Sequence, residues 1–459
     1  MSQGLIMSQG LIMGQGLLLA LGLPMGQGPG PRGAGISLAG AIMVGERLAR
    51  RSRPIPRRRL LSRSPLKACA PQQEIAVSIP FRYVAKIGSY IIKQHLMGVK
   101  RYPLVLMLEP LFRCNLECAG CGKIDYPDHI LNKRLSVEDS LASVDECGAP
   151  VVVIAGGEPL LHKDLPEIVE GIIARGKFAI VCTNALLLTK KIDQYKPSPY
   201  FTWSIHLDGD KEMHDKAVCQ EGVYERAVEA LQLAKSKGFR VTTNSTFFAD
   251  ADPERVAKFL DDTTKLGVDG MTVSPGYAYE RAPDQTHFLN RQRTKELFRS
   301  ILARGRGGKA WAFQQSGLFM NFLAGNESYF CTPWGNPLRT VFGWQRPCYL
   351  LGEGYVPTFK QLMEETDWDA YGVGNYEKCA DCMVHSGFEA SAVNDAVRRP
   401  WKAAAVALFG VRTQGPMAPD ISLENQRPAE YVYDENVARL SEIREHEAKQ
   451  RAEQRSTAA

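Results

Sequence analysis

The sequence predicts an α/β fold: a partial (βα)6 barrel with a C-terminal cysteine-containing extension. Two observations predict it. Six short apolar runs recur through the middle of the chain, and segments with helical periodicity separate them. The runs lie at 103–110, 150–155, 178–183, 201–207, 240–247 and 270–275, and the helical patterns at 136–147, 164–175, 222–237 and 253–266. Strict strand–helix alternation implies parallel strands with right-handed crossovers, and functional groups at the strands' carboxyl ends.

The first 74 residues differ in composition from the rest of the chain. They begin with the Gly- and Met-rich repeat MSQGLIMSQGLIMGQG and continue into an Arg/Pro/Ser tract. Positive charge follows the apolar stretch, which reverses the order of a secretory signal, and such a composition cannot bury a core. We expect 1–74 to be disordered or to reflect an upstream translation start. Residues 1–75 carry a net charge of +8 and leave −2 for the remainder, so we expect no nucleic-acid partner.

The segment 75–102 predicts one helix, because Phe81, Val84, Ile87 and Ile91 recur at helical spacing. Two interpretations are open: a helix packed beneath the barrel, or a basic amphipathic helix resting on an anionic membrane. We expect the barrel to span 103–300, the extension 301–390, and a polar, partly disordered tail 391–459. No run of 18 apolar residues occurs, so no transmembrane helix is predicted. The sequence favours a cytoplasmic protein, open to peripheral contact with the inner membrane.

Three cysteines follow the first predicted strand in a CxxxCxxC spacing. Cys114, Cys118 and Cys121 can hold three irons of a [4Fe–4S] cluster and leave the fourth iron open to a ligand that is not protein. Zinc is the alternative, although it usually takes four ligands and CxxC pairs. The chain has eleven cysteines, an odd count that favours metal or redox chemistry over disulfides.

Together with Gly156-Gly157-Glu158-Pro159 after the second strand, this motif resembles the radical S-adenosylmethionine (SAM) superfamily. The resemblance implies one open-site [4Fe–4S] cluster, SAM as co-substrate, and an electron donor such as flavodoxin or ferredoxin. It also implies that SAM contacts the strand ends, with His206 standing where relatives often have a small polar residue. The implied SAM-binding residues are Gly156, Gly157, Glu158, Asn184, His206, Asp208 and Asn244. The plain alternative for GGEP is an ordinary strand-to-helix turn.

A closer resemblance covers roughly 75–390. The segments EPLFRCNLECAGCGK, IAGGEPL, VCTNA, TTNSTF and FGWQRPCYL resemble the HpnH-type radical SAM proteins of hopanoid biosynthesis. This implies a C–C bond-forming adenosyl transfer, in which the 5′-deoxyadenosyl radical adds to the alkene of the triterpene lipid diploptene and gives adenosylhopane. Peptide modification with an auxiliary cluster is the alternative function. A non-catalytic iron–sulfur or zinc scaffold is a third, but it would have no use for GGEP beside an open cluster.

Four further cysteines follow the predicted barrel. Cys331, Cys348, Cys379 and Cys382, with Gly343 between the first two, resemble the small auxiliary-cluster (twitch) module of many radical SAM enzymes. They could hold a second [4Fe–4S] cluster or a zinc ion, or remain unligated thiols.

The adenosyl addition would leave a carbon radical that needs one hydrogen atom. A thiol suits this step because its S–H bond is weaker than the C–H bond formed. Cys182, at the carboxyl end of the third predicted strand, is our candidate catalytic residue. The alternative is a buried, inert thiol. Tyr277 and Tyr279 are rival donors.

Overall fold

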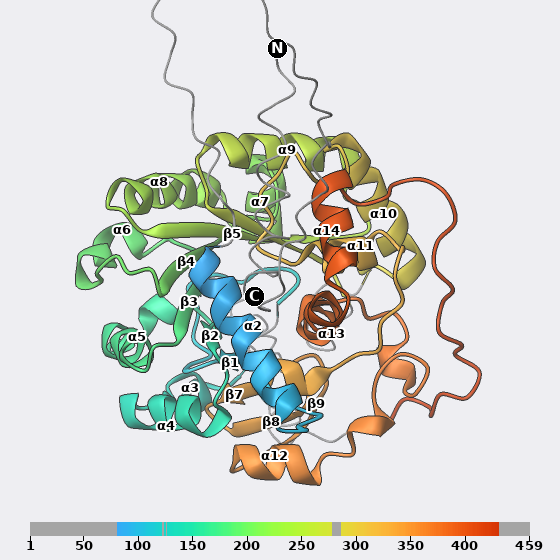
Figure 1. The fold of residues 1–459 in the computed structure, drawn as a ribbon. Helices are drawn as coiled ribbons and strands as arrows, with labels where there is room; N and C mark the ends of the chain where they lie inside the picture. The colour runs from blue at the N-terminus through green and yellow to red at the C-terminus, as the bar shows by residue number, and fades with distance from the viewer. Residues whose placement is uncertain (1–79, 122–123, 125, 278–285, 431–459) are drawn as a thin grey trace, which may run out of the picture. The chain divides into compact units, whose positions relative to one another are not determined.

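The computed structural model describes residues 80–121, 124, 126–277 and 286–430. All of them belong to one compact unit (Figure 1). The predicted leader 1–74, the end of the predicted tail and Tyr279 lie outside the described residues.

A nine-stranded sheet organises this unit, in the order β6-β5-β4-β3-β2-β1-β7-β8-β9. The six predicted strands are confirmed, and each pairs in parallel with the next. Their bounds are β1 Val105–Leu108, β2 Val151–Ile154, β3 Phe178–Thr183, β4 Phe201–His206, β5 Arg240–Phe247 and β6 Gly270–Pro275.

The helices between these strands cover one face of the sheet (Figure 1). They are α3 Asp128–Leu131, α4 Val137–Cys147, α5 Leu165–Ala174, α6 Leu188–Lys191, α7 Lys211–Ala217, α8 Val223–Ser236 and α9 Pro253–Lys265. Local sequence fixes where several begin: the Ser136 side chain caps α4, and the Asp252 side chain caps α9, whose first residue is proline. Val152, Val181, Trp203 and Val241 form the main core with these helices.

The other face of the sheet carries polar side chains on β4 and β5. Paired residues of a parallel ladder project to the same side, and side chains alternate along each strand. Cys182 of β3 pairs with Ser204 of β4. Two residues further along β4, towards its carboxyl end, His206 pairs with Asn244 of β5. This inner face therefore gathers polar side chains at the end of the sheet where the sequence places the cysteine loop.

The C-terminal extension adds three strands that the sequence did not predict. β7 Leu338–Thr340 joins the free edge of β1 in parallel, and β8 Gly343–Pro347 and β9 Gly352–Val356 continue it antiparallel. These strands have three to five residues and no clear alternation, so their sequence gave little signal. Gly343 has a φ of 135°, and an added Cβ would lie 2.7 Å from the carbonyl oxygen of Val356.

Helices complete the extension: α10 Arg291–Arg304, α11 Gly317–Leu323, α12 Phe359–Glu365, α13 His385–Arg398 and α14 Pro400–Phe409. The expected tail boundary at 391 falls inside α13. Phe388 and Ala392 on that helix are buried in the core, so the packed region extends beyond the boundary predicted from polarity. In the view of Figure 1, α13 is drawn between helix α11 and strands β7 to β9.

The N-terminal helix α2, Phe81–Leu96, packs beneath the barrel, as one of the two interpretations predicts. Ile91 is buried with Tyr102 and Ala390, and Lys86 donates to the carbonyl of Gly176, just before β3. Tyr83 stacks on Phe178, the first residue of that strand. The helix therefore lies at the amino ends of the strands, away from the cysteine loop. Among the described residues, no helix has both the length and the apolar character needed to span a bilayer.

Candidate active site

The cysteine loop leaves the end of β1 and is anchored by backbone hydrogen bonds. The amide of Gly157 donates to the carbonyl of Leu111 at 3.0 Å, and the amide of Glu158 to that of Arg113 at 2.9 Å. Leu116 between the first two cysteines is buried with Leu186, Val218 and Val223, and Cys114 and Cys118 pack against the same cluster. An apolar anchor thus fixes a loop that carries three thiols.

The three thiols lie close enough to interact. Burial raises the pKa of Cys114 to about 11, with Cys121 contributing, and raises that of Cys118 further, with both other thiols contributing. Among the described residues, no group of three His, Cys, Asp or Glu side chains surrounds a single-ion position. The thiolates of a [4Fe–4S] cluster bind separate irons and so span more space than the ligands of one ion. Three neighbouring thiols on one anchored loop are a suitable donor set for such a cluster.

Local backbone geometry explains why the GGEP segment has two glycines. Gly156 has a φ of 112°, a conformation that favours glycine. A Cβ on Gly157 would collide with the carbonyl oxygens of Phe112 and Arg113. The cysteine loop itself therefore requires both glycines.

Glu158 has a structural role that the sequence did not indicate. Its carboxylate is buried and accepts hydrogen bonds from the Leu160 amide at 2.9 Å, the Thr183 hydroxyl at 2.7 Å and the Asn184 amide at 2.9 Å. Burial raises the pKa of this carboxyl and the three hydrogen bonds oppose the shift. Glu158 thus ties the end of β2 to the end of β3, and a direct contact with SAM stays a prediction.

Asn184 lies against the cysteine loop. The side-chain nitrogen Nδ2 of Asn184 is 2.8 Å from Oδ1 of Asn115 and 3.9 Å from the sulfur of Cys114. Sequence reasoning named Asn184 but missed Asn115. Its position directly after a cluster cysteine was the available signal.

His206 and Asp208 form a polar pair at the end of β4. Nε2 of His206 is 2.7 Å from Oδ2 of Asp208, and Oδ1 of Asp208 accepts from the Thr246 amide at 2.7 Å. Burial alone would lower the pKa of His206, but the charge and hydrogen bond of Asp208 outweigh it and raise the pKa. Asp208 therefore favours the protonated form of the His206 ring. A contact with SAM stays a prediction for both residues and for Asn244.

A second histidine, His214 on α7, supports this pair and was missed. Its Nδ1 accepts from the Asp208 amide at 3.2 Å, and burial lowers its pKa to about 4, so the ring is neutral. Nothing in the sequence marked it, since histidines on helices are common.

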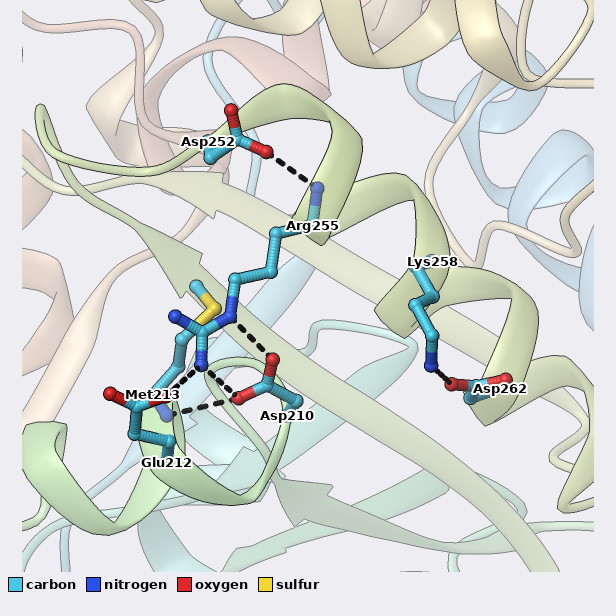
Figure 2. Close-up of polar contacts among 7 residues, drawn as sticks. All are labelled: Asp210, Glu212, Met213, Asp252, Arg255, Lys258 and Asp262. Atoms are coloured by element: carbon cyan, nitrogen blue, oxygen red, sulfur yellow. Dashed lines mark hydrogen bonds and ion pairs between the residues drawn. The ribbon is translucent and has the colours of Figure 1, made fainter.

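A salt-bridged clamp holds the loop that follows β4, as Figure 2 shows. Asp210 caps α7 by accepting from the Met213 amide at 3.2 Å, and Arg255 on α9 donates to Asp210 at 2.5 and 2.7 Å. Arg255 also reaches Glu212 at 2.8 Å. The carboxyl end of β4 is thereby fixed to the helix that follows β5.

Cys182 lies on the inner face, beside Ser204. Burial raises the pKa of its thiol to about 11, and Ser204 hydrogen-bonds to it. Glu158, in turn, interacts electrostatically with both Cys182 and Cys114. The thiol is thus protonated at neutral pH. Glu158 is the charged group that influences both this thiol and the cysteine loop.

The rival donor Tyr277 faces elsewhere. Its hydroxyl donates to the carbonyl of Lys378, and Cys382, Cys379 and Cys348 interact with it electrostatically. It therefore belongs to the surroundings of the C-terminal thiols.

The four C-terminal cysteines converge although 51 positions separate Cys331 from Cys382. Burial raises the pKa of Cys331 well above its usual value. Electrostatic interactions with Cys382, Cys348 and Cys379 raise it further. Cys348 follows β8, and Cys382 precedes α13, whose first residue, His385, hydrogen-bonds Ser274 of β6 at 2.8 Å. Four partly buried thiols in one neighbourhood suit the donor set of a second cluster.

Residues 108–263 match the radical SAM superfamily, a range that includes β2 to β5, the cysteine loop and the GGEP turn. The chain carries a radical SAM domain. Radical SAM enzymes use a [4Fe–4S] cluster and SAM, and the three loop thiols suit that cluster. Residues 271–406 of this radical SAM protein match a domain of unknown function, DUF3463, which spans most of the C-terminal extension.

The radical SAM domain resembles proteins of several activities. The chain is 30% identical over 133 residues to Fe-coproporphyrin III synthase of Methanosarcina barkeri, covering 28% of this chain and 33% of that protein. It is 28% identical over 155 residues to GTP 3′,8-cyclase of Listeria monocytogenes, covering 32% and 46%. It thus spans a third to a half of the length of these curated relatives. Neither name concerns a hopanoid, so the hopanoid assignment stays a proposal.

A solved structure similar to this fold is native anSMEcpe with bound AdoMet and Cp18Cys peptide. The match has a TM-score of 0.44 and 16% identity, and it covers 66% of this chain and 99% of that one.

Proposed function

We propose that this radical SAM enzyme adds the adenosyl group of SAM to the alkene of an apolar substrate, and that diploptene is that substrate. The hopanoid resemblance of the sequence supplies the substrate. The observation that supports the reaction type is Cys182: a protonated thiol on the inner face, two residues before Asn184, whose side chain contacts the cysteine loop.

The cluster on Cys114, Cys118 and Cys121, when bound, supplies the electron that cleaves SAM into methionine and an adenosyl radical. The chain's own residues then have three tasks. Leu116 and its apolar neighbours hold the loop. Glu158 fixes the ends of β2 and β3 relative to each other. His206 and Asp208 present polar groups at the next strand end.

Cys182 completes the reaction. Addition of the 5′ carbon to the alkene forms one C–C bond and leaves a carbon radical on the substrate. The Cys182 S–H bond breaks and its hydrogen atom forms the new C–H bond, which leaves a thiyl radical. One electron from a reductant of the flavodoxin or ferredoxin class and one proton restore the thiol.

Anaerobic turnover with SAM, a reductant and diploptene tests the proposal directly. We expect a lipid product whose mass has gained the adenosyl group and one hydrogen, with one methionine formed per product. SAM cleavage that yields only 5′-deoxyadenosine, with diploptene recovered unchanged, would contradict it.

The four C-terminal thiols favour a second candidate, modification of a peptide. An auxiliary cluster there could accept the electron released when a substrate radical is oxidised, a reaction that needs no hydrogen donor. In that reaction 5′-deoxyadenosine is released and the substrate loses hydrogen. The mass of the product therefore separates the two candidates.

A further inference from the structure

The C-terminal helix α14, Pro400–Phe409, is apolar, yet none of its residues is buried. Trp401 is 66% exposed, Leu408 37% and Phe409 81%, and Ala405 is exposed as well. Positions 401, 405, 408 and 409 share one face of a helix. Other positions of the helix contact the unit: Val406 lies against Gly317, and Lys402 pairs with Glu327 at 2.7 Å. The exposed stripe is therefore a surface without a partner among the described residues.

Positive charge lies near both ends of this stripe. Residues 398–419 contain four Lys or Arg and no acidic residue, and residues 299–313 repeat that composition. The two segments lie together: Lys309 donates to the carbonyl of Leu408 at 2.7 Å, and the Val411 amide donates to that of Gly307 at 2.9 Å.

Several of these cations remain available for a partner. Among the described residues, the acidic groups that pair with these two segments are Asp395 with Arg399, and Asp395 and Glu327 with Lys402. Arg306, Lys309 and Arg398 are exposed, and no ion pair is recorded for them within the described ranges.

A Trp, a Leu and a Phe on one helix face, bordered by cations, match the chemistry of the lipid–water interface. Aromatic and aliphatic side chains enter the headgroup–acyl boundary, while Lys and Arg are attracted to anionic lipid. We propose that α14 seats this protein on the surface of an anionic phospholipid bilayer. Trp401, Leu408 and Phe409 enter the interface, and Arg306, Lys309 and Arg398 face the headgroups. The proposal goes beyond the proposed function and does not depend on it.

Helix α2, the membrane candidate of the sequence, offers a weaker surface. Its exposed apolar residues are Phe81 at one end and Leu96, with the following Met97, at the other. A helix rises about 1.5 Å per residue, so these groups lie roughly 20 Å apart along the axis. They do not form one stripe, and Leu96 and Met97 provide a matched control.

Vesicle sedimentation of the full chain, purified anaerobically with its cluster, tests the proposal. We expect binding to phosphatidylcholine vesicles that contain about one third phosphatidylglycerol, weaker binding to phosphatidylcholine alone, and loss of binding as salt rises. Trp401→Ser, Leu408→Ser and Phe409→Ser combined should weaken binding at least tenfold. Leu96→Ser with Met97→Ser should bind like the wild type. None of the changed side chains is buried, so iron content and circular dichroism should stay unchanged.

A second variant tests the charges separately. Arg306→Gln, Lys309→Gln and Arg398→Gln combined should weaken binding to the anionic vesicles by about fivefold per charge, with little change on neutral vesicles. Equal binding by the wild type and both α14-region variants would overturn the proposal, as would failure of the wild type to bind anionic vesicles. A wild-type dimer that dissociates in the Trp401 variant, without vesicle binding, would assign the stripe to a second copy of the chain instead.

Discussion

Cys147 is buried and Cys182 is partly buried, but Cys182 lies on the inner face of the sheet whereas Cys147 ends α4. If Cys182 donates the final hydrogen atom, Cys182→Ala should still cleave SAM and form the adenosyl–lipid bond. The yield of saturated product should fall at least tenfold, with oxidised or rearranged adducts in its place. Mass spectrometry of the products, under conditions free of added thiol, measures this.

Cys147→Ala is the matched control, since burial also raises the pKa of that thiol, to about 12, but it ends α4 in the main core. It should cost stability and leave the product distribution unchanged. Full yield of saturated product from Cys182→Ala would remove this thiol from the mechanism.

Glu389 on α13 gives the folded state a pH dependence. Oε1 accepts from the Ser316 amide at 2.8 Å, Oε2 is buried with no hydrogen-bond partner within the described ranges, and burial raises the pKa to about 7. A carboxyl whose pKa is higher in the folded than in the unfolded chain stabilises the fold at low pH, and this contribution is lost as pH rises from about 4.5 to 7.

We therefore expect Glu389→Gln to stabilise the protein at pH 8 by about 1–3 kcal/mol relative to wild type, and by much less at pH 5. Denaturant unfolding at both pH values gives the difference. Glu229→Gln, at an exposed position of α8, should show no such pH-dependent gain. An equal effect of Glu389→Gln at the two pH values would show that the carboxyl is ionised throughout.

For individual residues, the sequence patterns showed which residues belong to the candidate site but not which groups those residues contact. Spacing alone singled out Cys114, Cys118 and Cys121 as candidate ligands, because the three thiols share one loop. Glu158 was also singled out, but its three hydrogen bonds depend on where β3 ends, which a local pattern does not contain. Asn115 was missed for the same reason, since its contact is with Asn184, 69 positions later, whereas His214 lies only six positions from Asp208 but carries no pattern that marks it.

Among the elements, the GGEP turn and the cysteine loop form one unit. A Cβ at Gly157 would meet two carbonyl oxygens of the loop, so Gly157→Ala must push the loop away from the turn. We expect a loss of about 1–3 kcal/mol in stability and at least a halving of bound iron after anaerobic reconstitution. Iron and sulfide assays on the purified variant check this.

Gly88→Ala is a suitable comparison, because Gly88 lies within α2 and an added Cβ would meet no atom within 4 Å. That change should raise stability by about 0.5–1 kcal/mol and leave bound iron unchanged. Normal iron content in Gly157→Ala would mean that the loop and the turn move independently.

Periodicity predicted the elements well wherever one strand and one helix repeat. The six parallel strands and the intervening helices each bury one apolar face, so their patterns are regular. β7 to β9 were missed because β7 gains its place by pairing with β1, more than 200 positions earlier. The polar appearance of residues after 390 likewise concealed α13, which buries small residues such as Ala392.

Across the molecule, the two groups of cysteines are joined through the sheet. β1 leads into the loop with Cys114, and the same strand pairs with β7 of the extension that carries Cys331 and Cys348. Tyr277, just after β6, reaches the C-terminal thiols from the other edge of the barrel. The extension thus contacts the radical SAM domain at both edges, which suits a second cluster held at a fixed distance from the first.

Iron stoichiometry tests that arrangement. If the four C-terminal thiols hold a second [4Fe–4S] cluster, the reconstituted wild type should contain about eight irons per chain, and Cys379→Ser with Cys382→Ser about four. That variant should keep reductive cleavage of SAM, because its loop thiols are intact. Cys114→Ala with Cys118→Ala should also retain about four irons but lose SAM cleavage entirely. Four irons in the wild type, with one zinc that the Cys379/Cys382 variant loses, would assign the C-terminal thiols to zinc and leave the radical site as described.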